Sequence, residues 1–132
     1  VVFCQRLYML RNCFNTFSQR LSERKRYLKM IRVIIEREVA EGLEEFYESA
    51  IANLLGAMSN AGGYLSGESL VDIHRPNHYV VVTRWIDEAA WNRWHGSSER
   101  QEMLDAIGPF LLNEEKFTLL RQLIFHQELS AA

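Results

Sequence analysis

Hydrophobic residues in this chain switch between a two-residue and a 3.6-residue period, in an order that few folds accommodate. Residues 31–39 (IRVIIEREV) place apolar side chains at alternate positions, which predicts a strand with one buried face. Over residues 42–58 the apolar positions instead recur at the i, i+3, i+4, i+7 spacing of an amphipathic helix. The sequence NAGG at 60–63 then ends the helix, because glycine tolerates the left-handed backbone of a helix cap.

The second half of the chain repeats the two periods in a different order. Residues 64–73 and 78–86 read as strands, and the short turn HRPN between them predicts an antiparallel hairpin. Asp87 is suited to cap a short helix over residues 88–95, which Gly96 ends. The spacing of SERQ (Ser98–Gln101) is that of a capping box, which predicts another short helix as far as Gly108–Pro109.

A last strand is predicted over residues 116–124, which completes the order strand, helix, strand, strand, helix, strand. This order predicts an α+β, ferredoxin-like βαββαβ fold. Right-handed crossovers then place the helices on one face of a four-stranded antiparallel sheet. Val80, Val81 and Val82 are consecutive, so both faces of their strand are apolar. We therefore expect the face away from the helices to be buried against a second copy, giving a homodimer.

The charge of the chain is distributed unevenly. Its 132 residues suit one domain, and the formal net charge is −2. Residues 1–30 nevertheless carry seven Lys or Arg and one acid, which leaves sixteen acids against eight bases in the remainder. An acidic main domain argues against a nucleic-acid partner. No apolar run approaches the roughly 18 residues that span a bilayer, so we expect no membrane partner for the main domain.

The basic N-terminal segment carries its own apolar stripe, typical of one face of a helix. It fits a helical extension, an organelle-targeting or membrane-surface helix, or a segment that is not native to the protein. We accordingly divide the chain into an extension (1–29), a main domain (30–124) and a tail (125–132). Both cysteines, Cys4 and Cys13, lie in the extension, so a reducing compartment is expected. This favours the cytoplasm, with organelle targeting as the alternative.

Three stretches resemble a known family. They are MIRVIIEREVAEGLEEFYE, AGGYLSGESLVDIHRPNHYVVVTRWIDEAAWNRWHGSSERQ and KFTLLRQL. In combination they are similar to the antibiotic biosynthesis monooxygenase domain over residues 30–123, which implies a dimeric α/β barrel. The resemblance implies one of several activities, namely cofactor-independent oxygenation of aromatic polyketides, haem degradation or isomerisation of a sugar phosphate. The fold is therefore better determined than the chemistry.

The haem-degrading members imply an Asn on the first strand, a Trp on the helix after the third strand, and a His about ten residues further on. Trp94 fits, but the first position falls near Glu36 and the last near Met103 or Leu104. Without that His the haem iron would lack its proximal ligand. We therefore expect no cofactor. A sugar-phosphate isomerase would need cations in its cavity, for which Arg84 and Arg93 are candidates.

The resemblance implies a ligand cavity between the helices and the sheet. Its aromatic walls would bind a flat ligand, and the candidates for substrate binding are Trp85, Trp91, Trp94, Tyr64 and Phe46. The opposing interpretation is that the tryptophans are ordinary core residues. At the hairpin, His74, His78 and Asp72 are interpreted as a polar turn rather than a metal site.

The catalytic candidates are His95 as a base, Tyr79 as a hydrogen-bonding group, and Glu36. Glu36 and Arg37 fall on opposite faces of the first strand, so only one of them points inward. The predicted function is a cofactor-independent monooxygenase for a small aromatic or hydrophobic substrate. The alternative is a dimer that binds such a molecule without converting it.

Overall fold

A computed structural model describes the backbone of residues 2–123 and the side chains of residues 16–123. The elements are, in chain order, α1 (Val2–Lys29), β1 (Ile31–Glu38), α2 (Glu44–Ser59), β2 (Tyr64–Val71), β3 (His78–Trp85), α3 (Glu88–His95), α4 (Ser98–Ile107), the 3₁₀ turn η1 (Gly108–Phe110) and β4 (Lys116–Arg121). After α1, the order is the βαββαβ arrangement predicted from the sequence.

The four strands form one antiparallel sheet in the order β2-β3-β1-β4. The ferredoxin-like prediction is therefore confirmed. Opposite Ile35 of β1 lie Val81 of β3 and Phe117 of β4. Because side chains alternate along a strand, Val33, Ile35 and Arg37 point to the same face of the sheet and are all buried.

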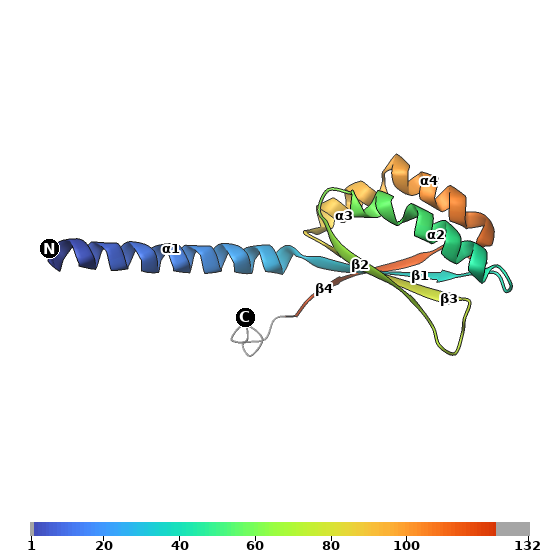
Figure 1. Cartoon of the computed structure of the whole chain (residues 1–132), viewed down its shortest axis with the longest axis horizontal. Coiled ribbons are helices and arrows are strands. Elements are labelled where there is room, and N and C mark those ends of the chain that lie inside the picture. Colours follow the sequence, from blue (N-terminus) through green and yellow to red (C-terminus); the bar gives the residue numbers. More distant parts are fainter. Residues whose placement is uncertain (1, 124–132) are drawn as a thin grey trace.

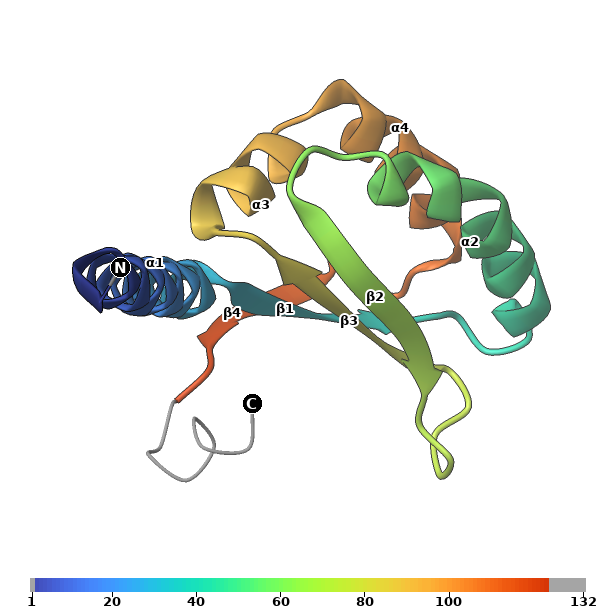
Figure 2. The same cartoon turned by 60° about the vertical axis from the view of Figure 1, so that its left-hand side comes forward.

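All three helices of the main domain cover that one face (Figures 1 and 2). The opposite face is open to solvent within the described residues, and Ile34, Val80 and Val82 lie on it only partly buried. The dimer expected from this face remains a prediction.

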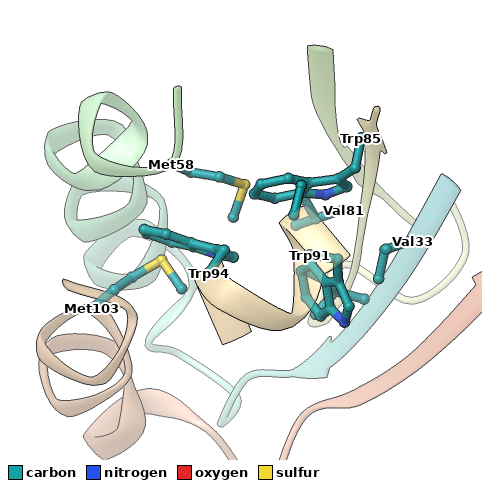
Figure 3. Packing of buried hydrophobic residues seen from close by; sticks show 9 residues of the cluster. Val33, Met58, Val81, Trp85, Trp91, Trp94 and Met103 are labelled. Atoms are coloured by element: carbon teal, nitrogen blue, oxygen red, sulfur yellow. The ribbon is translucent and has the colours of Figure 1, made fainter. Parts of the chain in front are cut away.

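The core lies between the sheet and the helices. Figure 3 shows how Trp85, Trp91 and Trp94 pack with Met58 and Met103. A second buried cluster lies towards the other end of the sheet and consists of Val39, Tyr47, Tyr79 and Ile107. Burying an aromatic or aliphatic side chain of this size stabilises the fold by about 1.5–3 kcal/mol each.

The N-terminal cap of α3 is the predicted residue, whereas the cap of α4 lies one residue earlier than predicted. The Asp87 side chain accepts a hydrogen bond from the Ala90 N–H, as predicted for the cap of α3. The cap of α4 is Ser97, whose hydroxyl oxygen accepts a hydrogen bond from the Arg100 N–H, and not Ser98 as the spacing of SERQ indicated. A serine one residue earlier thus supplies the acceptor.

Strands β2 and β4 end two and three residues earlier than predicted, and β1 and β3 end one residue earlier. β2 ends at Val71 because Asp72 turns the chain: its carboxylate accepts hydrogen bonds from the N–H groups of His74 and Arg75. β4 pairs with β1 only as far as Arg121, opposite Ile31, where β1 itself begins. The predicted tail, 125–132, lies outside the described residues.

Helix α1 projects away from the sheet as a separate rod (Figure 1). In its described part Phe17, Leu21 and Leu28 are exposed, beside basic residues such as Arg24. No helix among the described residues is both long and apolar enough to cross a membrane.

Candidate functional site

A pocket of about 170 Å³ lies between α2 and the strands β2 and β3. Its lining residues are Arg37, Ile51, Leu54, Leu55, Met58, Tyr64, Gly67, Glu68, Ser69, Val81, Thr83 and Met103. Leu55 and Glu68 are exposed, which places the mouth between α2 and the edge strand β2. The walls are mostly aliphatic, so the few polar groups decide what the pocket can hold.

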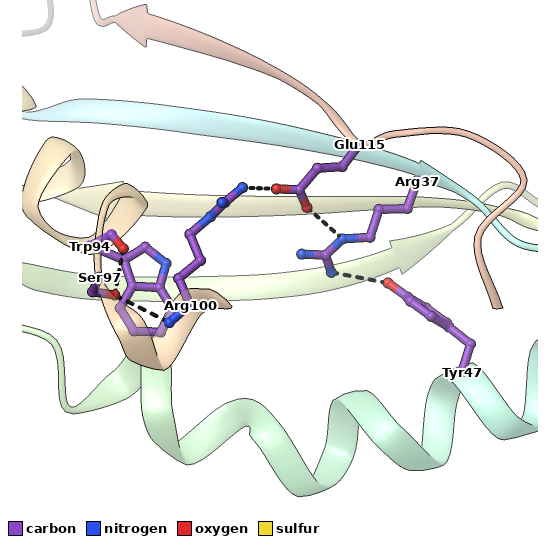
Figure 4. Close-up of polar contacts among 6 residues, drawn as sticks. All are labelled: Arg37, Tyr47, Trp94, Ser97, Arg100 and Glu115. Carbon is purple, nitrogen blue, oxygen red and sulfur yellow. Dashed lines mark hydrogen bonds and ion pairs between the residues drawn. The ribbon is translucent and has the colours of Figure 1, made fainter. Parts of the chain in front are cut away.

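Arg37 is the buried charge of this pocket. It lies at an inward position of β1 with 3% of its surface exposed. Its Nε donates to Glu115 Oε2 at 3.0 Å, and its Nη1 donates to the Tyr47 hydroxyl at 3.2 Å (Figure 4). The remaining nitrogen, Nη2, is buried and has no hydrogen-bond partner among the described residues.

A second arginine shares the same carboxylate. Arg100, in the first turn of α4, donates from Nη2 to Glu115 Oε1 (Figure 4). Two guanidinium groups therefore surround one carboxylate, and all three side chains are less than a tenth exposed. Burial, together with the neighbouring charge of Arg37, lowers the pKa of Arg100 from its ordinary value. The cluster of Arg37, Glu115 and Arg100 carries a net charge of +1 beneath the pocket.

Tyr64 and Gly67 shape the pocket where it meets the sheet. A Cβ at Gly67 would lie 2.5 Å from the Tyr64 hydroxyl oxygen, so the tyrosine occupies space that only glycine leaves free. The Tyr64 hydroxyl makes no hydrogen bond to the described residues, and burial raises its pKa. It therefore stays protonated and can donate a hydrogen bond to a ligand.

The three tryptophans are buried core residues that lie outside this pocket. Trp85, Trp91 and Trp94 are each at most 4% exposed, and none of them lines the pocket. The Trp85 indole N–H donates to Thr83 Oγ1 at 2.9 Å, and the ring packs edge-on against Tyr64 with centroids 5.4 Å apart. Trp85 thus supports one side of the pocket through its neighbours.

His95 and Phe46, two other candidates, lie away from the pocket. The His95 ring is partly buried against Phe117, with centroids 4.8 Å apart, and against Trp91 at 5.5 Å. Burial and the charge of Arg100 lower the pKa of His95. Phe46 is 62% exposed on α2.

The other two catalytic candidates are also separated from the pocket. Tyr79 lies further along β3, where its hydroxyl donates to Glu48 Oε1 at 2.7 Å. Burial and the Glu48 carboxylate raise the pKa of Tyr79 well above its ordinary value, so it is a donor and not a base. Glu36 is exposed on the open face of the sheet, opposite Val80. Of the two alternatives on β1, the structure places Arg37 inward.

The remaining charged candidates are on the surface. Arg93 is exposed on α3, and Arg84 lies on the open face of the sheet. In the turn after β2, the Asp72 carboxylate accepts a hydrogen bond from the backbone N–H of His74. This hydrogen bond is the main cause of the lowered pKa of Asp72. No group of three or more potential metal ligands occurs among the described side chains.

Sequence reasoning did not single out the cluster of Arg37, Glu115 and Arg100. The alternation of β1 was the available signal, since it places Arg37 on the same face as Val33 and Ile35. The contribution of Glu115 had no such signal, because it comes from the loop before β4, 78 residues further along the chain.

Comparison with known proteins gives a family and a fold. The sequence profile described as "Antibiotic biosynthesis monooxygenase" matches residues 30–106, more than half of the chain. No curated protein matches the chain.

Several solved structures share the fold of the main domain. A Bordetella bronchiseptica protein provisionally named an antibiotic biosynthesis monooxygenase is 20% identical, with a TM-score of 0.68 over 73% of this chain and 99% of that one. A conserved protein from Methanosarcina mazei Go1 is 15% identical, with a TM-score of 0.67 over 74% and 96% of the two chains. SnoaB, a cofactor-independent oxygenase from Streptomyces nogalater, is 19% identical, with a TM-score of 0.62 over 73% and 97%.

Proposed function

The chain belongs to the antibiotic biosynthesis monooxygenase family, and we propose that it is a cofactor-independent monooxygenase that acts on a small aromatic or hydrophobic substrate. The observation that carries the proposal is the pocket beneath α2, whose aliphatic walls surround Tyr64 and the guanidinium nitrogen of Arg37 that has no hydrogen-bond partner among the described residues. SnoaB, a cofactor-independent oxygenase with the same fold, supports the reaction class.

The reaction needs a substrate with an acidic C–H group next to an aromatic ring. Loss of that proton gives a carbanion that reduces O₂ directly, and oxidation of a CH₂ group to a carbonyl by one O₂ releases one water. The aliphatic walls keep bulk water from the carbanion. Tyr64 donates a hydrogen bond to the substrate, and Glu68, the one carboxylate among the lining residues, accepts the proton at the mouth.

Oxygen consumption by the full chain tests this function. We expect O₂-dependent conversion of at least one member of a panel of single-ring aromatics that carry a hydroxyl group and a CH₂ group next to the ring. Tyr64→Phe keeps the ring and removes the donor, so it should slow turnover by about tenfold or more. Tyr27→Phe, on α1, is the matched control and should leave the rate unchanged. If no panel member consumes oxygen above the uncatalysed rate, the proposed activity is refuted.

Haem serves as an additional substrate in the same assay. The pocket is smaller than the roughly 300 Å³ at which sites for drug-sized ligands begin, so we expect no bleaching of the haem Soret band. Bleaching would instead assign the chain to the haem-degrading members that it resembles.

Binding without turnover is the second candidate function, and one observation favours it. Among the described residues that line the pocket there is no histidine, and the only carboxylate is at the exposed mouth. Saturable ligand binding with no oxygen consumption by any panel member would support this function.

We also propose that the protein forms a homodimer through the open face of its sheet. Ile34 and Val82 lie opposite one another at the centre of that face, and Leu70 and Leu120 are exposed near its two edges. Light scattering should report a dimer for the wild type and a monomer for Val82→Glu, because the buried carboxylate would have no partner. Asn53→Glu, on the exposed side of α2, adds the same charge and should leave the dimer intact. A monomeric wild type would refute the dimer.

A further inference from the structure

We propose that the pocket is built for a single-ring aromatic anion, whose charged oxygen accepts a hydrogen bond from Nη2 of Arg37. The inference deepens the proposed function, because it names the class of molecule that the pocket admits. It concerns binding, and it can therefore be true or false whether or not the ligand is oxidised.

The charge of the Arg37, Glu115 and Arg100 cluster favours an anionic ligand. Glu115 already pairs with both Arg37 and Arg100, so its single negative charge cannot neutralise two guanidinium groups. Buried charges are normally paired, and an uncompensated one is costly. Glu68, the only carboxylate among the described lining residues, is exposed at the mouth and does not contact the cluster. An anion bound at Arg37 would therefore balance the cluster, whereas a neutral ligand of the same shape would leave the excess positive charge in place.

Nη2 of Arg37 is a buried donor without a partner among the described residues. Arg37 lines the pocket, is almost fully buried and uses Nε and Nη1 on Glu115 and Tyr47, which leaves Nη2 as an unsatisfied donor. Figure 4 shows this nitrogen pointing away from both partners. The two-nitrogen fork that grips a carboxylate is not available, so the geometry suits a contact with one anionic oxygen.

The size of the pocket limits the ligand to a single ring. The pocket measures about 170 Å³. An engineered protein cavity of about 150 Å³ is known to hold benzene, so this pocket has room for one ring with a small substituent. Its walls at Ile51, Leu54 and Val81 provide the apolar contact that the ring needs. A polycyclic ligand would have to displace α2 or protrude through the mouth.

Equilibrium binding by tryptophan fluorescence or calorimetry tests the proposal, with benzoate and its neutral counterpart benzamide as probes. We expect the full chain to bind benzoate about ten- to a hundredfold more tightly, as one hydrogen bond to a charged group predicts. Arg37→Met should abolish this preference while benzamide binding stays the same. Arg93→Met removes the same charge from the exposed side of α3 and should leave the preference intact. Equal affinities in the wild type, or a preference that survives Arg37→Met, would overturn the proposal.

Two further probes keep the test decisive if Arg37→Met fails to fold. Para-nitrophenol changes colour on ionisation, and on the wild type we expect its bound form to ionise at a pH at least one unit lower than in solution. Unchanged or weakened ionisation would count against an anion site. Anthracene carboxylate should bind at least tenfold more weakly than benzoate, and equal or tighter binding would refute the single-ring limit. Because none of these measurements involves oxygen, failure of the proposed oxygenase would leave them unaffected, and the reverse also holds.

Discussion

Replacing Glu115 by Gln should destabilise the protein far more than replacing Arg37 by Met, although the two side chains form the same ion pair. The side chains of Arg37, Glu115 and Arg100 are 2%, 8% and 9% exposed. Glu115→Gln leaves two buried guanidinium groups without a counter-charge, which costs about 3–5 kcal/mol. Arg37→Met leaves one carboxylate paired with one guanidinium, and its main loss is the hydrogen bond to Tyr47, worth about 1 kcal/mol.

Urea unfolding followed by fluorescence measures both free energies. Thermal unfolding provides a second measurement, because for a chain of this length 1 kcal/mol corresponds to about 4 °C in Tm. We therefore expect Tm to fall by roughly 12–20 °C for Glu115→Gln and by about 4 °C for Arg37→Met. The double variant Arg37→Met/Glu115→Gln holds only one unpaired cation, whereas Glu115→Gln holds two. Its free energy of unfolding should therefore be no more than about 1 kcal/mol below that of Glu115→Gln, and it can be higher. Equal losses for the two single variants would refute the assignment of a surplus positive charge to this cluster.

Two further changes test the packing and the titration of α3. Gly63 has φ +87°, and a Cβ there would lie 2.5 Å from the Cβ of Ala90. Gly63→Ala should therefore lower the free energy of unfolding, measured in urea, by at least about 2 kcal/mol. Gly62 has open space around it, so Gly62→Ala should lower the free energy by less than about 0.5 kcal/mol. Burial lowers the pKa of His95 below the ordinary 6.5, so the unfolded chain takes up the proton first and stability falls as the pH drops from about 7 to 5. His95→Gln should reduce that acid-induced loss, and an unchanged pH dependence in His95→Gln would contradict the assignment.

The fold could be predicted from the sequence because its signals are local. Alternation and helical spacing within each element identify the buried faces, and Asp87 and Gly96 mark the ends of α3 without reference to the rest of the chain. The boundaries that were wrong depend on finer choices. Ser97 and Ser98 are chemically equivalent caps, and only the backbone conformation at residue 97 selects the first. The role of Asp72 in ending β2 likewise depends on the turn that its carboxylate closes.

The tryptophans show why residue type alone does not locate a pocket. An indole ring fits both a ligand wall and a core, and the choice depends on what faces it. Trp85 meets Trp91 edge-on at 5.7 Å and stacks on Trp94 at 6.5 Å, so the three rings fill the space between α3 and the sheet with one another. The empty volume remains where α2 presents aliphatic side chains to Gly67 and Thr83, residues too small to fill it.

The inward position of Arg37 could be predicted from its own strand, but its ion-pair partner could not. Its position in the alternation of β1 predicts an inward side chain, and a buried arginine implies an acidic partner. The sequence offers sixteen acids beyond residue 30, and spacing cannot choose among them. The fold selects Glu115 because the loop into β4 returns beside the end of β1, and it brings Arg100 to the same carboxylate from α4. The positive charge of the site thus arises from β1, α4 and the loop before β4, which meet only in the folded chain. A preference for an anionic ligand over a neutral one of the same shape would therefore report on this arrangement.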